Sequence, residues 1–178
     1  MRRRRLVSAF LVASCAFVPL AGCGFSPVYA PMAGGQAPEA GLGLVYVAVI
    51  PDRPGQELRQ ALQVRLEGSG APSAKEYTLQ VAYSISGEGI GIDPDTDTTF
   101  MRYLGHADWQ LLGAVPGTKP LASGTVNVQD GYSIIVNQYF FQSLDTDALY
   151  QRMAENVANQ IVVRVADYFH NKDKVAQR

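Results

Sequence analysis

The sequence predicts an α+β fold, a two-layer sandwich in which a sheet of about four strands carries two α-helices on one face. Three segments alternate strictly between apolar and polar residues, and two others place apolar residues every three or four positions. A run of β-branched residues precedes the first of these helical segments. The resulting order is β-α-β-β-β-α, and packing both helices on the apolar face of the sheet buries every apolar stripe in one core.

The first strand and the first helix follow each other directly. Residues 44–50 are rich in β-branched residues, which is typical of a buried strand, and a Pro-Asp-Arg-Pro sequence ends the run. Residues 55–67 are predicted to form a helix because Leu58, Leu62 and Leu66 recur at four-residue spacing. A Gly-Ser-Gly sequence ends this helix.

Three alternating strands come next, at residues 77–86, 100–112 and 122–129. A Gly- and Asp-rich loop separates the first two, and Pro116-Gly117 marks a hairpin turn before the third. The residues predicted to point into the core are Tyr77, Leu79, Val81, Tyr83, Ile85, Met101, Tyr103, Ala107, Trp109, Leu111, Ala122, Gly124, Val126 and Val128. The opposite face carries Thr78, Gln80, Ser84, Arg102, His106, Asp108, Gln110, Ser123, Thr125, Asn127 and Gln129.

Residues 147–170 are predicted to form a long amphipathic helix. Its apolar stripe consists of Leu149, Met153, Val157, Ile161, Val165 and Phe169, widened by Ala154, Ala158 and Val162. The charges expected to complement the helix dipole are Asp145 and Asp147 at its N-terminus and His170, Lys172 and Lys174 at its C-terminus. The folded domain is therefore expected over residues 44–171, followed by a polar tail at residues 172–178.

The N-terminus reads as an export signal followed by a lipid attachment site. Residues 2–5 are four arginines, a short apolar core follows, and residues 20–23 read Leu-Ala-Gly-Cys. This ending resembles a bacterial lipobox, so residues 1–22 are predicted to be removed and Cys23 to carry the lipid that holds the domain at a membrane. An ordinary secreted protein cut near this point is the alternative. Residues 23–43, rich in Gly, Pro and Ala, are predicted to be a flexible tether.

Charge and cysteine content exclude several functions for the mature chain. Four of the 15 Lys and Arg residues lie in the signal, so 11 remain against 16 Asp and Glu, a net charge near −5. An acidic domain is poorly suited to neutralising phosphates, and no nucleic-acid partner is predicted. Cys15 leaves with the signal and Cys23 is used by the lipid. The folded domain therefore has no thiol for a disulfide, a metal site or a nucleophile.

Nothing in the sequence forms a recognisable active site. His106 and Asp108 lie two residues apart on a predicted strand and face the same way, but no third member of a catalytic set is visible. A structural hydrogen bond is the preferred interpretation, and a lipid-anchored hydrolase that uses this pair is the competing hypothesis. The protein is predicted not to be an enzyme and to need no cofactor.

One loop begins like a calcium-binding loop, with Asp93, Asp95 and Asp97. Such a loop needs Gly at its sixth position and Glu at its twelfth, where this chain has Thr98 and Leu104. The match fails, so no metal ligand is predicted, and whether the loop binds any cation stays open. The Gly-x-Gly-x-Gly sequence before it leads into Asp-Pro rather than into a helix, which excludes a phosphate-binding loop.

The face of the sheet opposite the predicted helices is polar but nearly uncharged. Freely solvated surfaces more often carry many Lys and Glu residues. A neutral surface of Ser, Thr, Asn and Gln side chains would suit contact with another polar surface, such as the lumen of a large outer-membrane barrel. Plain exposure to solvent is the equally weighted alternative.

Several segments together resemble the LptE family of lipopolysaccharide-assembly lipoproteins, in the form found in alphaproteobacteria. The chain has Cys-Gly-Phe-Ser-Pro-Val-Tyr at residues 23–29, directly after the lipobox, and Ile-Pro-Asp-Arg at residues 50–53 leading into Gly-Gln-Glu-Leu-Arg-Gln-Ala-Leu. Arg102 precedes the strand Ala-Asp-Trp-Gln-Leu at residues 107–111, and the closing helix matches as well. The resemblance spans nearly the whole mature chain.

The resemblance implies a non-enzymatic lipoprotein, anchored on the periplasmic side of the outer membrane. Such a protein plugs and helps to assemble the LptD β-barrel and assists the transport of lipopolysaccharide into the outer leaflet. Its implied partners are an LptD-like barrel, lipopolysaccharide and the membrane. Gly24 after the lipidated cysteine is compatible with sorting to the outer membrane. The alternative is an adaptor subunit of another envelope lipid-transport system.

The resemblance also implies contact with lipopolysaccharide through basic residues. Arg102 is the position that carries over, because it lies just before the family's central strand. A guanidinium can bind a lipid A phosphate in bidentate fashion, which gives this contact a physical basis. Lys119 lies in the predicted neighbouring hairpin turn and is expected to add a second charge close by.

Overall fold

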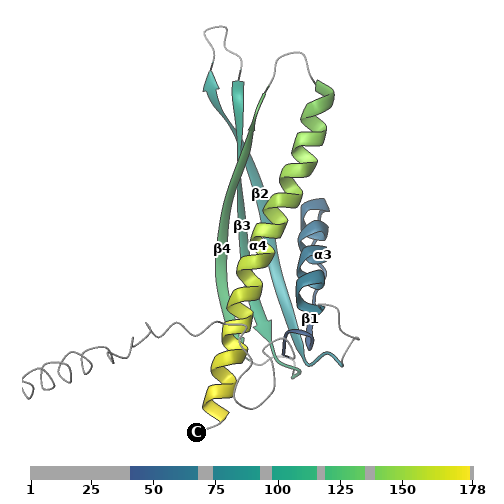
Figure 1. The fold of residues 1–178 in the computed structure, drawn as a ribbon, viewed down its shortest axis with the longest axis vertical. Coiled ribbons are helices and arrows are strands. Elements are labelled where there is room, and N and C mark those ends of the chain that lie inside the picture. Colours follow the sequence, from purple (N-terminus) through teal and green to yellow (C-terminus); the bar gives the residue numbers. More distant parts are fainter. Residues whose placement is uncertain (1–40, 68–73, 93–97, 116–118, 135–138, 177–178) are drawn as a thin grey trace, which may run out of the picture.

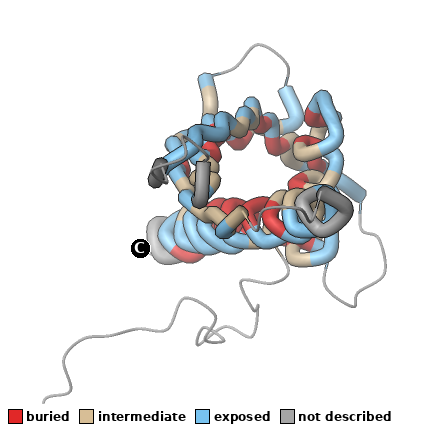
Figure 2. Tube along the Cα trace, turned by 90° about the horizontal axis from the view of Figure 1, so that it is seen from above, coloured by how far each residue is buried: buried red, intermediate tan, exposed pale blue. Residues whose placement is uncertain are grey.

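The predicted fold is confirmed. The computed structural model describes residues 41–67, 74–92, 98–115, 119–134 and 139–176. In this part of the chain a four-stranded sheet has the strand order β1-β2-β3-β4, and two helices, α3 and α4, cover the same face of it (Figure 1). Seen end-on, the buried residues line the space between the sheet and the helices (Figure 2).

Strand β1 (Val45–Val47) is shorter than the predicted run at residues 44–50. It pairs in parallel with β2 (Tyr77–Ile92), since helix α3 (Arg53–Glu67) carries the chain back between the two strands. The last contact with the ladder is made by Ala48, whose N–H donates to the carbonyl of Leu79 at 2.9 Å. Pro51 has no N–H to donate, so the chain leaves the sheet here and turns into the helix.

Helix α3 begins at Arg53, two residues before the predicted start. Asp52 adopts a left-handed backbone conformation (φ 65°), and its carbonyl accepts the first helical hydrogen bond from the N–H of Gln56 at 3.0 Å. Pro54 is tolerated because the first helical turn has no use for its missing N–H. Gly55 permits close packing, since a Cβ there would lie 2.7 Å from Cγ2 of Ile50.

Strand β2 continues to Ile92, so the prediction of a loop after residue 86 is wrong. It forms a long antiparallel hairpin with β3 (Thr98–Leu112), in which Gly87 lies opposite Tyr103. A Cβ on Gly87 would lie 2.8 Å from Cε1 of Tyr103, so glycine makes room for the ring on the helix side of the sheet. The acidic segment with Asp93, Asp95 and Asp97 and the turn at residues 116–118 lie outside the described residues.

Strand β4 (Ala122–Ser133) pairs antiparallel with β3 and completes the sheet. The predicted alternation is confirmed: Val126, Trp109 and Leu79 are almost fully buried on the helix side. The face away from the helices, which we call the open face, carries the predicted polar side chains. Those classed as exposed are Gln80, Ser84, His106, Asp108, Gln110, Ser123, Thr125, Asn127 and Gln129.

Helix α4 (Tyr139–Ala176) is longer than predicted at both ends. All six residues of its predicted stripe, from Leu149 to Phe169, are at most 5% exposed, as predicted. Its first turns pack on the sheet through aromatic contacts: the Tyr132 and Thr146 hydroxyl oxygens lie 3.1 Å apart, and the ring of Tyr150 meets that of Tyr103 edge-on with centroids 6.0 Å apart. These tertiary contacts fasten the N-terminal half of α4 to the sheet.

The charges expected at the ends of this helix have other roles. No acidic residue lies in the first turn, and Asp147 instead pairs with Arg53 of α3 at 3.0 Å. His170 does not close the helix: it is 8% exposed and lies inside α4, which runs on through most of the predicted polar tail. Lys172 donates to the Tyr77 hydroxyl at 2.7 Å and lies over that ring.

Gly105 of β3 is a tightly packed position under α4. A Cβ there would lie 2.8 Å from both Cε of Met153 and Cγ2 of Val128. Gly105→Ala should therefore lower the free energy of unfolding by about 1–3 kcal/mol through overpacking, measured by urea denaturation. The matched control is Gly113→Ala, where the nearest atom, on Leu121, would be 3.6 Å away. Equal losses for the two variants would contradict this packing.

Candidate functional site

The candidate site lies on the open face, toward the end where β2 and β3 form their hairpin. Arg102 of β3 lies directly across from Glu88 of β2. Its Nε donates to Oε1 of Glu88 at 2.6 Å, and its Nη2 contacts the same oxygen. The Arg102 side chain is 37% exposed. A guanidinium has five N–H donors, so this pairing leaves donors for a second acceptor.

Apolar side chains surround this ion pair. Ile90 of β2 and Phe100 of β3 lie opposite each other, two residues closer to the β2–β3 hairpin than Glu88 and Arg102. Leu104 lies two residues from Arg102 in the other direction along β3. These three side chains are each 37–41% exposed. Glu88, Ile90, Phe100, Arg102 and Leu104 together form what we call the tip patch, a charged pair set within exposed apolar surface.

Gly131 of β4 borders the tip patch, and its lack of a side chain leaves the surface there flat. It lies opposite Arg102, and a Cβ there would fall 2.6 Å from the carbonyl oxygen of Met101 and 2.7 Å from Cζ of Phe100. The Phe100 ring therefore lies over the glycine.

Tyrosine side chains pack at the same end of the sheet, on the face that carries the helices. The rings of Tyr103 and Tyr132 stack with centroids 5.9 Å apart. Burial, followed by the hydrogen bond to Tyr132, raises the pKa of Tyr103 to about 12. This phenol is neutral at physiological pH and serves packing and hydrogen bonding.

Lys119 does not lie near Arg102, and the expectation of two neighbouring charges is wrong. Arg102 pairs with Gly131, whereas the start of β4 at Ala122 pairs with Leu111, nine residues along β3. Nine residues of strand span about 30 Å. Lys119 is exposed beyond the start of β4, at the other end of the sheet. The hairpin connecting β3 and β4 is thus remote from the tip patch.

A polar network occupies the middle of the open face. Nδ1 of His106 lies 2.7 Å from Oδ1 of Asn127, and Nε2 lies 3.2 Å from Oδ2 of Asp108. The other carboxylate oxygen of Asp108 accepts a hydrogen bond from the Thr125 hydroxyl at 2.6 Å. The preferred interpretation of the His106–Asp108 pair as a structural hydrogen bond agrees with this geometry. Thr125 is bonded to the carboxylate and not to the imidazole, so it is not placed as an activated nucleophile.

These contacts shift the pKa values of His106 and Asp108 in opposite directions. The hydrogen bonds to Asn127 and then Asp108 raise the pKa of His106, and those from Thr125 and His106 lower the pKa of Asp108. The contribution of His106 to the free energy of unfolding is fully present at pH values below the ordinary histidine pKa. It is lost as the pH rises through the raised pKa that His106 has in the folded protein. The contribution of Asp108 to the free energy of unfolding is present at pH values above the ordinary aspartate pKa. It is lost as the pH falls through the lowered pKa that Asp108 has in the folded protein.

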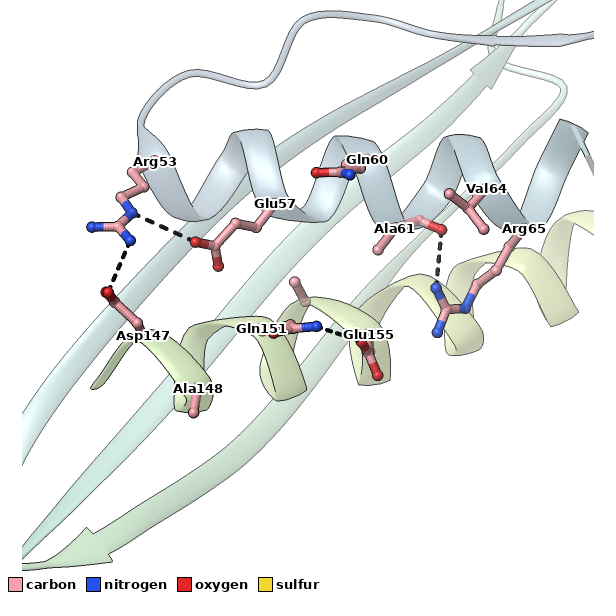
Figure 3. Close-up of a pocket in the computed structure, with 11 residues that line it drawn as sticks. Arg53, Glu57, Gln60, Ala61, Val64, Arg65, Asp147, Ala148, Gln151 and Glu155 are labelled. Carbon is pink, nitrogen blue, oxygen red and sulfur yellow. Dashed lines mark hydrogen bonds and ion pairs between the residues drawn. The ribbon is translucent and has the colours of Figure 1, made fainter. Parts of the chain in front are cut away.

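A separate groove of about 600 Å³ lies between α3 and α4 (Figure 3). At one end Arg53 contacts both Glu57, at 3.6 Å, and Asp147, at 3.0 Å. Burial is the main cause that raises the pKa of Glu57. At the other end Arg65 donates to the side-chain oxygen of Asn159. The ion pair between Arg53 and Asp147 and the hydrogen bond from Arg65 to Asn159 link α3 to α4 across the groove.

Other classes of site are tested only within the described ranges. No cluster of three or more His, Cys, Asp or Glu side chains that could hold a metal ion occurs among those residues. No described helix is both long and apolar enough to cross a membrane. Cys23 lies outside the described residues, so its lipidation stays a prediction.

Comparison with known proteins identifies the family. A family described as lipopolysaccharide-assembly, LptE, matches residues 42–165. No curated protein matches the chain. Among solved structures, a Caulobacter crescentus lipoprotein is similar with a TM-score of 0.60 and 21% identity, over 75% of this chain and 96% of that one.

Two further structures share the fold at lower identity. Rare lipoprotein B from Shewanella oneidensis has a TM-score of 0.54 and 13% identity, over 72% of this chain and 98% of that one. A minor lipoprotein from Acinetobacter baumannii has a TM-score of 0.54 and 14% identity, over 69% and 90%. At these identities the three structures support the fold alone. The family match covers most of the chain, and the protein therefore belongs to the LptE family of lipopolysaccharide-assembly proteins.

Proposed function

We propose that this protein is an outer-membrane lipoprotein, anchored on the periplasmic side through Cys23, that plugs an LptD-type β-barrel and helps to assemble it. In this role it assists the passage of lipopolysaccharide into the outer leaflet. The observation that carries the proposal is the family match over residues 42–165. The lipobox before Cys23 supports the anchor.

The shape and surface of the domain support a role inside a pore. The long sheet and the long helix α4 make an elongated body (Figure 1). Its open face presents neutral hydrogen-bonding side chains over much of its length. Such a face can exchange hydrogen bonds with a polar barrel lumen without burying unpaired charge.

The tip patch supports direct contact with lipopolysaccharide. A phosphorylated, acylated glycolipid combines phosphates with hydrocarbon chains, and the tip patch combines the Arg102 guanidinium with exposed Ile90, Phe100 and Leu104. The guanidinium fork matches a phosphate group. Lys119, at the other end of the sheet, is proposed as an independent contact for an anionic group.

The partner is tested by affinity purification of the lipidated protein from detergent-solubilised membranes. A large outer-membrane β-barrel should co-purify, and depletion of the protein should reduce lipopolysaccharide at the cell surface. Recovery of the protein with an inner-membrane ATPase complex would favour the adaptor alternative. Recovery alone, with a normal cell surface, would contradict the proposal.

Removing the guanidinium should weaken binding of lipopolysaccharide to the purified protein. A hydrogen bond to a charged group contributes about 1.5–3 kcal/mol, so Arg102→Ala should raise the Kd by about tenfold or more. Glu88→Gln should instead lower the Kd, because Glu88 competes for the same guanidinium. The matched control is Arg65→Ala, which removes one positive charge from the helix layer. Equal effects of Arg102→Ala and Arg65→Ala would rule out a specific contact.

A further inference from the structure

The net charge of the open face depends on one histidine. The charged or titratable side chains that β2, β3 and β4 place on this face, within the described residues, are Glu88, Arg102, His106 and Asp108. Glu88 and Arg102 form an ion pair and cancel. The remaining charge is the carboxylate of Asp108 and whatever charge His106 carries. A protonated His106 makes the face neutral, and a neutral His106 leaves it with one negative charge.

The geometry around His106 favours the protonated ring. A neutral imidazole has one N–H donor and one acceptor nitrogen, whereas an imidazolium has two donors. Both ring nitrogens of His106 face oxygen acceptors, Oδ1 of Asn127 at 2.7 Å and Oδ2 of Asp108 at 3.2 Å. The carboxylate is held in place by Thr125. With the Asn127 amide oxygen toward the ring, two donors are needed to satisfy both contacts.

The strand positions directly beside His106 carry no charge. The residue opposite it on β2 is Ser84, and on β4 it is Asn127. The next residue on the same face of β3 toward the tip patch is Leu104. No described element packs on this side of the sheet, since α3 and α4 both cover the other face (Figure 1). Within the described residues, Asp108 is the ionised group that contacts the ring.

Arg164 of α4 reaches the edge of β4, where its Nη1 donates to the carbonyl of Thr125 at 2.6 Å. An arginine stays charged over the range in which histidine titrates, so the change in charge on loss of the proton is that of His106 alone.

We propose that His106 is held as an imidazolium by Asn127 and Asp108, and that loss of its proton weakens the binding of a phosphorylated, acylated ligand to the tip patch. The second half of this inference rests on the ligand contact proposed for Arg102. His106 lies four residues from Arg102 along β3, about 13 Å away.

The expected size of the effect follows from this separation. At about 13 Å the loss of one positive charge weakens the attraction for an anionic group, by an amount set by the effective dielectric constant at the surface. At an ionic strength of about 10 mM, where screening over this distance is weak, affinity for the anionic ligand should fall about two- to tenfold as His106 loses its proton. Salt should reduce the effect, because the separation exceeds the Debye length at physiological ionic strength.

The protonation state can be measured without any ligand. The chain has two histidines, His106 and His170, so isotope labelling of histidine in the mature lipidated protein in detergent gives two ring signals, and His106→Gln assigns them. The nitrogen spectrum of His106 should show both ring nitrogens protonated at neutral pH. Asn127→Ala and Asp108→Asn should each lower its pKa, while Ser84→Ala should not. A single protonated ring nitrogen, with the Asn127 amide turned to donate, would overturn the proposal.

The effect of His106 on ligand binding is measured as the Kd for purified lipopolysaccharide from about pH 5 to about pH 9. This range brackets the titration of histidine. The phosphates of the ligand titrate in the same range, with a second pKa of about 6, so the wild type is compared with His106→Gln at each pH. The ratio of the wild-type Kd to the Kd of His106→Gln should rise about two- to tenfold across the pKa of His106. A ratio that does not change with pH would overturn the role of His106 and leave the Arg102 contact intact. No binding at any pH would instead refute the proposed Arg102 contact.

Discussion

Replacing Cys23 by alanine is expected to abolish fatty-acid labelling of the protein and to remove the mass of the acyl chains from its N-terminus. The lipobox that ends in Cys23 supplies the thiol for acylation. Each buried methylene of an acyl chain contributes about 0.8 kcal/mol of membrane affinity, and two or more chains make anchoring stable. Because this thiol is the predicted point of acylation, the loss of labelling should be complete and not partial.

The chain supplies its own matched control for this experiment. Cys15 is the other cysteine, and it lies within the apolar core of the predicted signal. Cys15→Ala should leave cleavage, fatty-acid labelling and membrane association unchanged. Fatty-acid labelling, together with the mass of the mature protein, measures both variants. Unchanged labelling of Cys23→Ala would show that the thiol does not carry the lipid.

Regular periodicity explains which parts of the fold could be predicted from the sequence. Alternation of apolar and polar residues identified β3 and β4, because a strand with one buried face must repeat every two residues. The four-residue spacing of Leu58, Leu62 and Leu66 identified α3 in the same way, and all three leucines are buried. Together these patterns fixed the two layers and the face on which the helices lie.

The ends of the elements were predicted less well, because distant residues decide them. The glycines after residue 86 are typical of a loop, yet β2 continues there because β3 pairs with it and the ring of Tyr103 fills the space above Gly87. Asp145 and Asp147 are typical of a helix N-terminus, yet α4 starts earlier, at Tyr139, and Thr146 just before the predicted start contacts Tyr132 of β4. These contacts cannot be read from the local sequence.

The same limit applies to the candidate site. Arg102 could be singled out from the sequence, but its partner Glu88 could not, because Glu88 was assigned to a loop. Extending the alternation of β2 through the glycines would have put Glu88 and Ile90 on the open face. Lys119 was expected beside Arg102 because the hairpin adjoins the same strand. The register shows that the hairpin adjoins the opposite end of that strand.

The interface between α4 and the rest of the domain should govern stability. Ile161 of α4 is fully buried in the core cluster that joins the sheet to both helices. Ile161→Ala should lower the free energy of unfolding by about 2–5 kcal/mol, through lost transfer energy and the cavity left behind. Ile161→Val, which removes one methylene, should cost about 0.5–1.5 kcal/mol. Urea denaturation of the purified protein measures both losses.

Val163 provides the control on the same helix. It lies two residues away from Ile161 but is 44% exposed, so Val163→Ala should change the free energy of unfolding by about 0.5 kcal/mol or less. The contrast between the two positions separates loss of packing from any general weakening of α4. If Ile161→Ala and Val163→Ala were equally mild, α4 would not be packed against the sheet in solution. The polar side chains of the open face would then not form one continuous surface, because packing of the core against α4 keeps the strands in register.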